Sequence, residues 1–451
     1  MPTIRAENVS QPDPGDVDSA LPGRRVPTVV RRFLETEAAG GVVLLVAAVA
    51  ALVWANSPWS ASYRTLWGTQ LSVSVGRFGM TEDLQHWVND GLMALFFFVV
   101  GLEIKRELVH GDLRDRRTAA LPALAAAGGM AVPALLFFLV NAGTAGAEGW
   151  GVPVATDIAF AIGVVALLGS KVPPSLKLFL LTLAIVDDIG AIVVIAVFYA
   201  HDLQPMFLAA AALLLAMMLA LRRANIVWTA PYVVLGIGVW LATQASGVHA
   251  TIAGVVLGLL APARALTSAA VARRWATDMA DEPGPTELDA MSRLAKTSVS
   301  PAERLERLLH PWTSFLVIPL FALANAGVVI RSDSFAAPGA VRVTAGVVIG
   351  LVVGKVVGIT AAVWLAVRSG LGRLPAGATW PMLVAIATVA GIGFTVSLFI
   401  SELAFDEGAL QDAAKIGVLG ASALAASALP AAVGALGFIG ASRKERSGES
   451  A

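Results

Sequence analysis

The chain has 451 residues, of which 57% are hydrophobic and only 14% are charged. Soluble domains carry about 25% charged residues, so this composition excludes an ordinary soluble protein and indicates one that crosses a membrane several times. The 32 basic and 32 acidic residues cancel, which gives no reason to expect a nucleic-acid partner, and the absence of cysteine excludes disulfides and thiolate metal sites.

Residues 1–32 contain proline, glycine, aspartate and arginine but no apolar core of the kind a cleaved signal peptide needs. We expect them to form a disordered cytoplasmic tail, and residues 444–451 to form a second one. Between the tails, across 33–443, apolar windows of about 20 residues predict an all-α polytopic fold of about twelve transmembrane helices. These spans lie near 39–55, 87–107, 118–141, 153–169, 175–200, 206–221, 228–243, 247–263, 311–330, 343–367, 380–402 and 411–440.

Basic residues gather in alternate connections, which orients the spans. Loops on the predicted outer side, at 142–152, 201–205 and 243–247, have no Lys or Arg, whereas the inner segments carry several each. Because basic loops stay in the cytoplasm, both termini are predicted to be cytoplasmic. The inner segment 265–300 is polar, with Asp-Glu-Pro-Gly-Pro at its centre, and we expect a flexible linker between two halves of the protein.

The first outer connection contains the segment LSVSVGRFGM (71–80). Apolar and polar residues alternate from Leu71 to Val75, and the chain then turns through Gly76 and Gly79, so the segment predicts a short extracytoplasmic β-hairpin over residues 69–80. An exposed strand edge invites pairing with another protomer, and we expect this hairpin to hold a homodimer together.

Two predicted spans are interrupted in corresponding places. The fourth contains Pro153 and the polar pair Thr156–Asp157, and the eleventh contains two glycines and Thr395 within GIGFTVS (391–397). Unwound backbone inside a membrane is tolerated only where it lines a cavity, so such a pair indicates a transporter's midplane binding site. Glycine and proline are also common in membrane helices, and this plainer explanation stays open for either segment alone.

Four ionisable residues fall at mid-membrane depth: Asp157, Asp187, Asp188 and Lys355. Each costs about 2.5–3.5 kcal/mol at a helix centre on insertion scales. A buried ion pair that merely locks helices together would account for Lys355 and one aspartate, but it leaves at least two carboxylates unneutralised. Adjacent residues on a helix point about 100° apart, so we expect Asp187 to pair with Lys355 while Asp188 faces a hydrated cavity shared with Asp157.

This arrangement predicts competition between a cation and protons. Two carboxylates and an oxygen of Thr156 are hard ligands, the type suited to a small alkali cation. Without a cation, burial and mutual repulsion favour the protonated acids. Lys355 is also flanked by Gly350, Gly354 and Gly358, whose face lets another helix approach closely.

Seven segments resemble, in the same order, the signature segments of the NhaA-type sodium/proton antiporters. They are VNDGLMALFFFVVGLEIKRELVHG, PVATDIAFAIGVVALLGSKVP, SLKLFLLTLAIVDDIGAIVVIAVFY, SGVHATIAGV, LERLLHPWTSFLVIPLFALANAGV, GKVVGI and GIGFTVSLFI. NhaA is itself a standard example of an inverted-repeat transporter. The resemblance therefore implies two inverted three-helix repeats with crossing discontinuous helices, in spans 4 and 11, and a smaller domain at a homodimer interface.

The resemblance also implies a function. A bacterium would use such a protein to export sodium, and also lithium, across its cytoplasmic (inner) membrane in exchange for protons, without a cofactor. By motif, Asp157 and Asp188 become the cation and proton carboxylates, and Asp187 and Lys355 become an ion pair that opens when sodium binds. If one sodium displaces a proton from each of two groups, transport is electrogenic and also driven by membrane voltage.

Further charged residues match a pattern associated in the family with activation by alkaline pH. They are Glu103, Arg106 and Glu107 at the end of the second span, Glu306, Arg307 and His310 at the start of the ninth, and His249. Snorkelling to the cytoplasmic interface explains the first cluster equally well. Histidine is common in the family where this chain has Arg307, which cannot titrate near neutrality, so the pH range of activation stays open.

Other functions that need membrane-embedded acids fit less well. The Gly-x-Gly-Asp motif of intramembrane aspartyl proteases is missing, because Asp157 follows Thr156 and Asp188 follows another aspartate. The acidic spacing that holds magnesium in lipid-phosphate enzymes is also missing. A different cation/proton antiporter and a sodium-coupled symporter for an organic solute stay open as alternatives, since both use midplane carboxylates.

Overall fold

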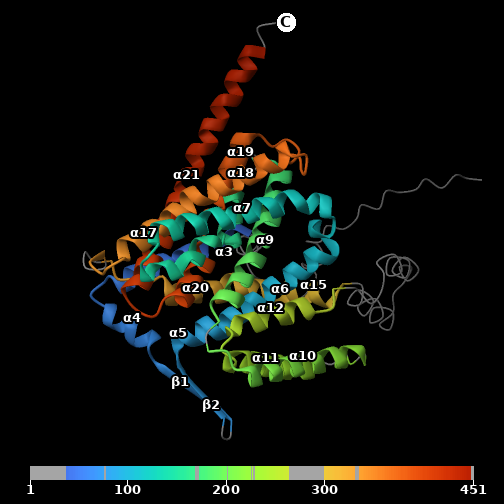
Figure 1. Ribbon diagram of the computed structural model, residues 1–451, viewed down its shortest axis with the longest axis vertical. Coiled ribbons are helices and arrows are strands. Elements are labelled where there is room, and N and C mark those ends of the chain that lie inside the picture. Colours follow the sequence, from blue (N-terminus) through green and yellow to red (C-terminus); the bar gives the residue numbers. More distant parts are fainter. Residues whose placement is uncertain are drawn as a thin grey trace, which may run out of the picture.

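The computed structural model describes residues 37–75, 78–167, 172–200, 202–224, 226, 229–263, 299–330 and 335–447. Across these residues the chain is almost entirely helical, with one two-stranded hairpin (Figure 1). The predicted tail 1–32, nearly all of the predicted linker 265–300 and the last four residues of the predicted tail 444–451 lie outside the described residues. Residues 444–447 belong to the last helix.

Helices form both the body of the molecule and its outer layer. The α-helices are α3 (Glu37–Ala55), α4 (Ser60–Trp67), α5 (Leu84–His86), α6 (Met93–His110), α7 (Arg116–Asn141), α8 (Ile158–Leu167), α9 (Pro174–Phe198), α10 (Pro205–Arg223), α11 (Thr229–Ala245), α12 (Ala250–Leu260), α15 (Pro301–Trp312), α16 (Ile318–Asn325), α17 (Ala340–Val348), α18 (Lys355–Arg368), α19 (Trp380–Val389), α20 (Phe394–Ala404) and α21 (Ala409–Ser447). Short 3-10 helices η2 (Asp112–Arg114) and η3 (Ala145–Val154), and π-helical segments η1 (Trp87–Leu92), η5 (Thr313–Val317) and η7 (Ile349–Gly354), lie between them.

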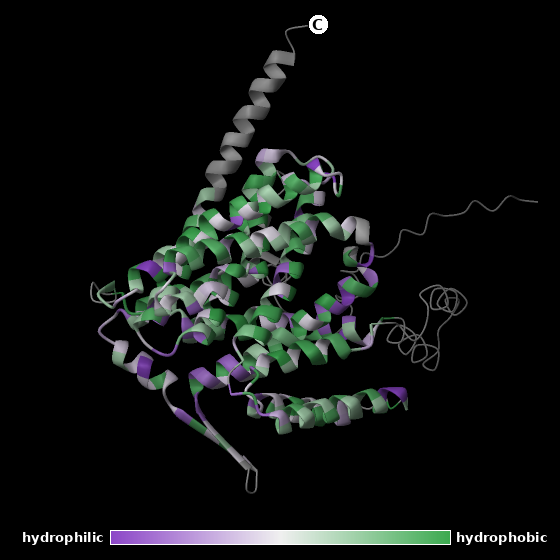
Figure 2. Ribbon diagram, viewed as in Figure 1, coloured by the Kyte–Doolittle hydropathy of each residue, from purple (hydrophilic) through white to green (hydrophobic). Residues whose placement is uncertain are grey.

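The helices suit a lipid environment. Five are long and apolar enough to cross a membrane, or up to eight if each of three bent helix pairs counts as one span, and α11 and α12 are apolar but shorter. Hydrophobic residues dominate the helices in Figure 2, and on α10 large apolar side chains such as Leu213 are exposed, as lipid-facing helices require. The chain is therefore a polytopic helical membrane protein, while the twelve spans and the inverted repeats stay predictions.

The two spans with interrupted sequences are broken where the sequence predicts. Helices η3 and α8 meet at 46° around residues 155–157, and α19 and α20 meet at 49° around residues 390–393. A third pair, α3 and α4, is bent by 116°. The first two breaks lie deep inside the molecule, because Thr156 and Ile392 are completely buried.

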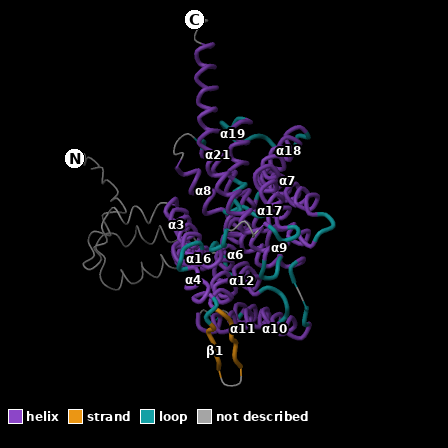
Figure 3. The backbone as a smooth tube through the Cα atoms, turned by 90° about the vertical axis from the view of Figure 1, so that its left-hand side faces the viewer, coloured by secondary structure: helices purple, strands orange, loops and turns teal. Residues whose placement is uncertain are grey.

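The predicted hairpin is present, with one correction. Strands β1 (Gln70–Val75) and β2 (Phe78–Asp83) pair antiparallel, and the hairpin projects from the helical body (Figure 3). The sequence analysis placed Gly79 in the turn, but Gly79 lies within β2, opposite Ser74. The reason is the register: Val75 already pairs with Phe78, so Gly79 falls inside the ladder.

Glycines let certain helices touch backbone to backbone. A Cβ atom added to Gly358 on α18 would lie 2.2 Å from the carbonyl oxygen of Gly128 on α7, and one added to Gly354 would lie 2.8 Å from the Cα of Pro133. On the other side of the molecule, a Cβ on Gly254 of α12 would lie 2.1 Å from the carbonyl oxygen of Ala94 on α6. The close approach predicted for the glycine face around Lys355 is therefore confirmed.

The helices pack in two groups. In the first, which we call the crossing group, α7, η3, α8, α9 and α17–α21 surround the broken spans. In the second, the flanking group, α5, η1, α6, α10–α12, α15 and α16 pack together, with α10 and α11 at its far edge (Figure 1). Helix α3 contacts both groups, through α8 and α16. Polar side chains form hydrogen bonds across the boundary between the two groups.

Candidate functional site

The two unwound segments are hydrogen-bonded to each other where they cross. Thr156 Oγ1 donates to the carbonyl oxygen of Ala390 (2.8 Å), and the backbone N–H of Asp157 donates to the carbonyl oxygen of Ile392 (2.7 Å). Gly391 is needed here because a Cβ at that position would lie 2.5 Å from the carbonyl oxygen of Leu351. Each segment thus satisfies backbone groups that the other leaves unpaired, as a membrane interior requires.

Asp157 holds the beginnings of both half-helices. Its Oδ1 accepts a hydrogen bond from the N–H of Phe160 in α8 (3.0 Å), and its Oδ2 accepts from the N–H (3.0 Å) and the Oγ1 (2.7 Å) of Thr395 in α20. Helix N-termini carry a partial positive charge. A single carboxylate, only 2% exposed, therefore faces the positive ends of two helices at once.

Asp187 and Lys355 form the ion pair that the sequence predicts. Lys355 Nζ lies 2.5 Å from Asp187 Oδ2 and also donates to the carbonyl oxygen of Val154, the last residue of η3, at 2.5 Å. Both side chains are completely buried. The pair therefore ties α9 and α18 to the end of the helix that leads into the crossing.

Asp188 is buried without a hydrogen-bonding partner for one of its oxygens. The residue is 5% exposed, and within the described part of the chain its Oδ1 has no partner. It interacts electrostatically with Asp187, Glu103 and Asp157, and with Lys355 as the only cation among these groups. An ionised carboxylate buried in this way is unfavourable unless a proton or a cation joins it.

Comparison with known proteins then identifies the family. The chain matches the family described as Na+/H+ antiporter 1 across residues 31–433. The protein belongs to the NhaA-type sodium/proton antiporters. It is 47% identical to "Na(+)/H(+) antiporter NhaA 3" of Frankia alni over 90% of this chain and 89% of that protein, and 47% identical to the NhaA antiporter of Rhodopirellula baltica over 88% and 91%. With the NhaA antiporter of Acidovorax sp. it shares 50% identity over 89% of this chain and 91% of the relative.

The antiporter's second charged cluster lies at the opposite end of α6 from the hairpin. Arg106 contacts Glu306 of α15 and lies 3.4 Å from Glu107 and 3.9 Å from Glu103. The structure thus brings together four of the residues that the sequence associates with pH activation, and these residues connect α6 to α15. Glu306 is buried, whereas Arg106 is about one-third exposed.

The remaining three of those residues lie elsewhere. Arg307 is exposed and pairs with Glu303, one turn earlier on α15, at 2.5 Å, and His310 is also exposed. His249 lies at the other end of α12, where its Nε2 is 3.6 Å from Asp90 Oδ1. The antiporter therefore separates His249 from the cluster by the length of α12.

Two partners in this site were not predicted as site residues. Thr395 gives both its N–H and its hydroxyl to Asp157, and the carbonyl oxygen of Val154 accepts from Lys355. Thr395 lies in the first turn of α20, inside the interrupted motif GIGFTVS, and the interruption itself is the sequence signal that could have marked it as a site residue. No sequence signal marks a backbone carbonyl such as that of Val154.

Proposed function

We propose that the chain exports Na+, and also Li+, in exchange for protons that compete with the cation for Asp188, with Asp157 and an oxygen of Thr156 completing the site. Membership of the NhaA-type family supports sodium/proton exchange itself. The observation that carries the proposed mechanism is the buried Oδ1 of Asp188, which has no partner among the described residues. An oxygen in this position gains from any proton or cation that reaches it.

Asp157 and the ion pair take different parts in this mechanism. Asp157 accepts hydrogen bonds at the N-termini of two half-helices, whose partial positive charge opposes the cost of burying an ionised carboxylate, and its oxygens attract the cation. Lys355 is held by Asp187 and by the carbonyl of Val154. A cation that draws Asp187 towards Asp188 would weaken this pair, and Lys355 would then release a proton.

Exchange by this route is electrogenic. One proton leaves Asp188 and one leaves Lys355 for each Na+ that binds, so one net charge crosses the membrane in each cycle. Moving one charge across 100 mV is worth about 2.3 kcal/mol, and the membrane voltage therefore drives export. We place the protein in the bacterial cytoplasmic membrane with both termini inside, as a homodimer joined through the hairpin. We further propose that the second charged cluster, in which Arg106 contacts Glu103, Glu107 and Glu306, sets the pH response.

The test is proton movement in liposomes that contain the purified protein. Asp188→Asn is expected to abolish sodium-driven proton movement, and Asp157→Asn to reduce it strongly. Asp202→Asn makes the same chemical change at an exposed residue and serves as the matched control. Parallel assays with lithium and potassium define the selectivity, and full activity in Asp188→Asn would refute the site.

A binding measurement separates competition from simple loss of function. Na+ affinity, measured by calorimetry over a pH series, is expected to fall steeply as the solution becomes more acidic, because protons occupy the same oxygens. An affinity that does not change with pH would contradict the proposed mechanism even if transport occurs.

A further inference from the structure

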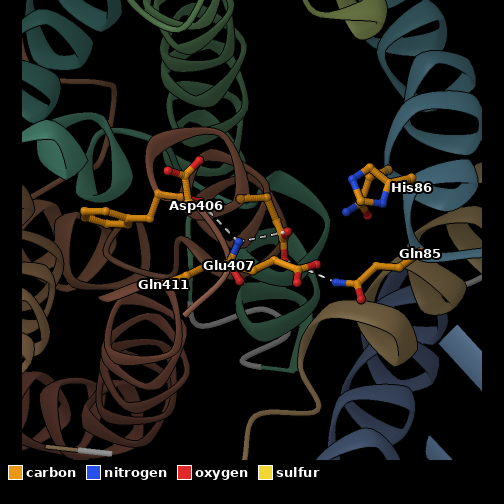
Figure 4. A pocket seen from close by; sticks show the side chains of 8 residues that line it. Gln85, His86, Asp406, Glu407 and Gln411 are labelled. Atoms are coloured by element: carbon orange, nitrogen blue, oxygen red, sulfur yellow. Dashed lines mark hydrogen bonds between the residues drawn. The ribbon is translucent and has the colours of Figure 1, made fainter. Parts of the chain in front are cut away.

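A polar pocket lies on the hairpin side of the molecule, where the two helix groups meet (Figure 4). Its volume is about 270 Å³. The rim carries three exposed side chains, His86, Asp406 and Glu407, whereas deeper in the pocket lie Gln85, Glu402 and the buried Gln411. The mechanism proposed above uses none of these residues.

A chain of hydrogen bonds runs through the deep side of this pocket. Gln85 Nε2 donates to Asn325 Oδ1 (3.0 Å) and, at 3.5 Å, to Glu402 Oε1. Asn325 in turn donates from Nδ2 to Asn89 Oδ1 (2.7 Å). On the other side, Glu402 pairs with Lys415, and its Oε2 accepts from Gln411 Nε2 (3.2 Å).

This chain of contacts crosses the boundary between the two helix groups. Gln85 and Asn325 belong to α5 and α16 of the flanking group, whereas Glu402 and Lys415 belong to α20 and α21 of the crossing group. Gln85 is the residue that bonds to both sides. Its bond to Glu402 is at the limit of hydrogen-bonding distance, so this is the weakest connection in the chain.

Helix α20 connects the contact between Gln85 and Glu402, which we call the bridge, to the ion site. It begins at the crossing, where Thr395 binds Asp157, and Glu402 lies seven residues further along the same helix, about 10 Å away at 1.5 Å per residue. A movement of the half-helix that accompanies cation binding would therefore also move the carboxylate of Glu402.

The partners on each side allow the bridge to separate without leaving a buried charge unpaired. If Gln85 and Glu402 move apart, Glu402 keeps Lys415 and Gln411, and Gln85 keeps Asn325. Water can then replace the single bond that is lost, at nearly equal energy. One turn earlier on α20, the buried Phe399 packs against Phe97 of α6 and Phe321 of α16, so the contact between Gln85 and Glu402 is the polar part of a boundary that also contains aromatic contacts.

We propose that the contact between Gln85 and Glu402 is a gate on the hairpin side of the transport path, closed in this structure, which separates when the site opens to that side. This inference rests on the proposed exchange of cations across the membrane. It assigns to Glu402 and Lys415 a role in opening the path rather than in binding the transported ion.

The test measures access to a buried residue from each side of the membrane. The chain has no cysteine, so Ser401→Cys, at the completely buried neighbour of Glu402, provides a single reporter for a membrane-impermeant maleimide. In this background, Gln85→Glu places a like charge opposite Glu402 and is expected to raise the labelling rate from the hairpin side roughly tenfold, the change in population that one hydrogen bond to a charged group controls. Gln85→Lys creates an attraction and is expected to lower the rate.

Opposite effects of the two substitutions on labelling from the hairpin side, with no rise in labelling from the other side, identify a gate, because loosening of a purely structural tie would expose the buried cysteine without preference for one side. Gln204→Glu and Gln204→Lys, at an exposed loop residue, are the matched controls and should leave labelling unchanged. Equal labelling in all variants, or an increase with both charges at position 85, would overturn the proposal. Repeating the measurement with Asp188→Asn separates the two hypotheses: the gate response should persist there although transport is lost, whereas full transport in Asp188→Asn would refute the ion site alone.

Discussion

Removal of the Lys355 ammonium should destabilise the protein far more than removal of the ammonium of Lys177, a partly exposed lysine on α9 of the crossing group. Lys355 and Asp187 are both completely buried, and Lys355 also binds the carbonyl of Val154. The substitution Lys355→Met leaves Asp187 buried without its cation. Breaking a buried pair in this way costs about 3–5 kcal/mol.

The expected loss is large enough for a thermal assay in detergent. At about 2–4 °C per kcal/mol for domains of 150–250 residues, a loss of about 3–5 kcal/mol should lower the melting temperature by roughly 6–20 °C. Lys177→Met, a partly exposed lysine near the start of α9, is the matched control and should change the melting temperature little. The double variant Lys355→Met/Asp187→Leu removes both charges and should recover part of the loss, since a buried pair replaced by apolar side chains is often neutral.

Two results would refute this reasoning. If Lys355→Met melts at the same temperature as Lys177→Met, the ion pair does not stabilise the fold. If the double variant is as unstable as the sum of the two single variants, the two residues do not interact as the geometry requires. Either result would also remove the role proposed for Lys355 in releasing a proton.

Three further predictions concern packing, assembly and pH. Gly358→Ala should lower the melting temperature, because the new Cβ would lie 2.2 Å from the carbonyl oxygen of Gly128, whereas Gly420→Ala, with open space around it, should not. Deletion of residues 71–80 should convert dimers to monomers in detergent, and an unaltered dimer in size-exclusion chromatography with light scattering would exclude the hairpin as the interface. Burial lowers the pKa of His86, but the hydrogen bond and charge of Asp83 outweigh it and raise the pKa above its ordinary value of 6.5. The pair therefore stabilises the fold below pH 6.5 and loses this contribution as the pH rises through the raised value, so His86→Asn should lower the melting temperature at pH 5.5 but not at pH 8.5.

The sequence predicts the chemistry of the site better than its geometry. The pairing of Asp187 with Lys355 follows from charge balance in an apolar region, and the breaks near Thr156 and Gly391 follow from glycine, proline and polar residues inside apolar spans. The double hydrogen bonding of Asp157 does not follow, because it depends on which half-helix lies opposite in three dimensions. Sequence alone places Thr395 on the right segment but not beside this carboxylate.

The π-helical segments and the contact between Gln85 and Glu402 could not be predicted from the sequence either. Segment η7, Ile349–Gly354, directly precedes Lys355, and its Gly350 and Gly354 lie close to Pro153 and Pro133, contacts that no local sequence pattern reveals. Glu402 and Gln85 are 317 positions apart. Each is an ordinary polar residue near the end of a span until the fold brings them together.

The shared carboxylate of Asp157 makes the two halves of the chain dependent on each other. Because Asp157 is hydrogen-bonded to the first turns of both helices, neither α8 nor α20 can shift along its axis without displacing the other. Positions 157 and 395 should consequently change together during evolution: a relative that loses the acid at the first position has no further use for the hydroxyl at the second.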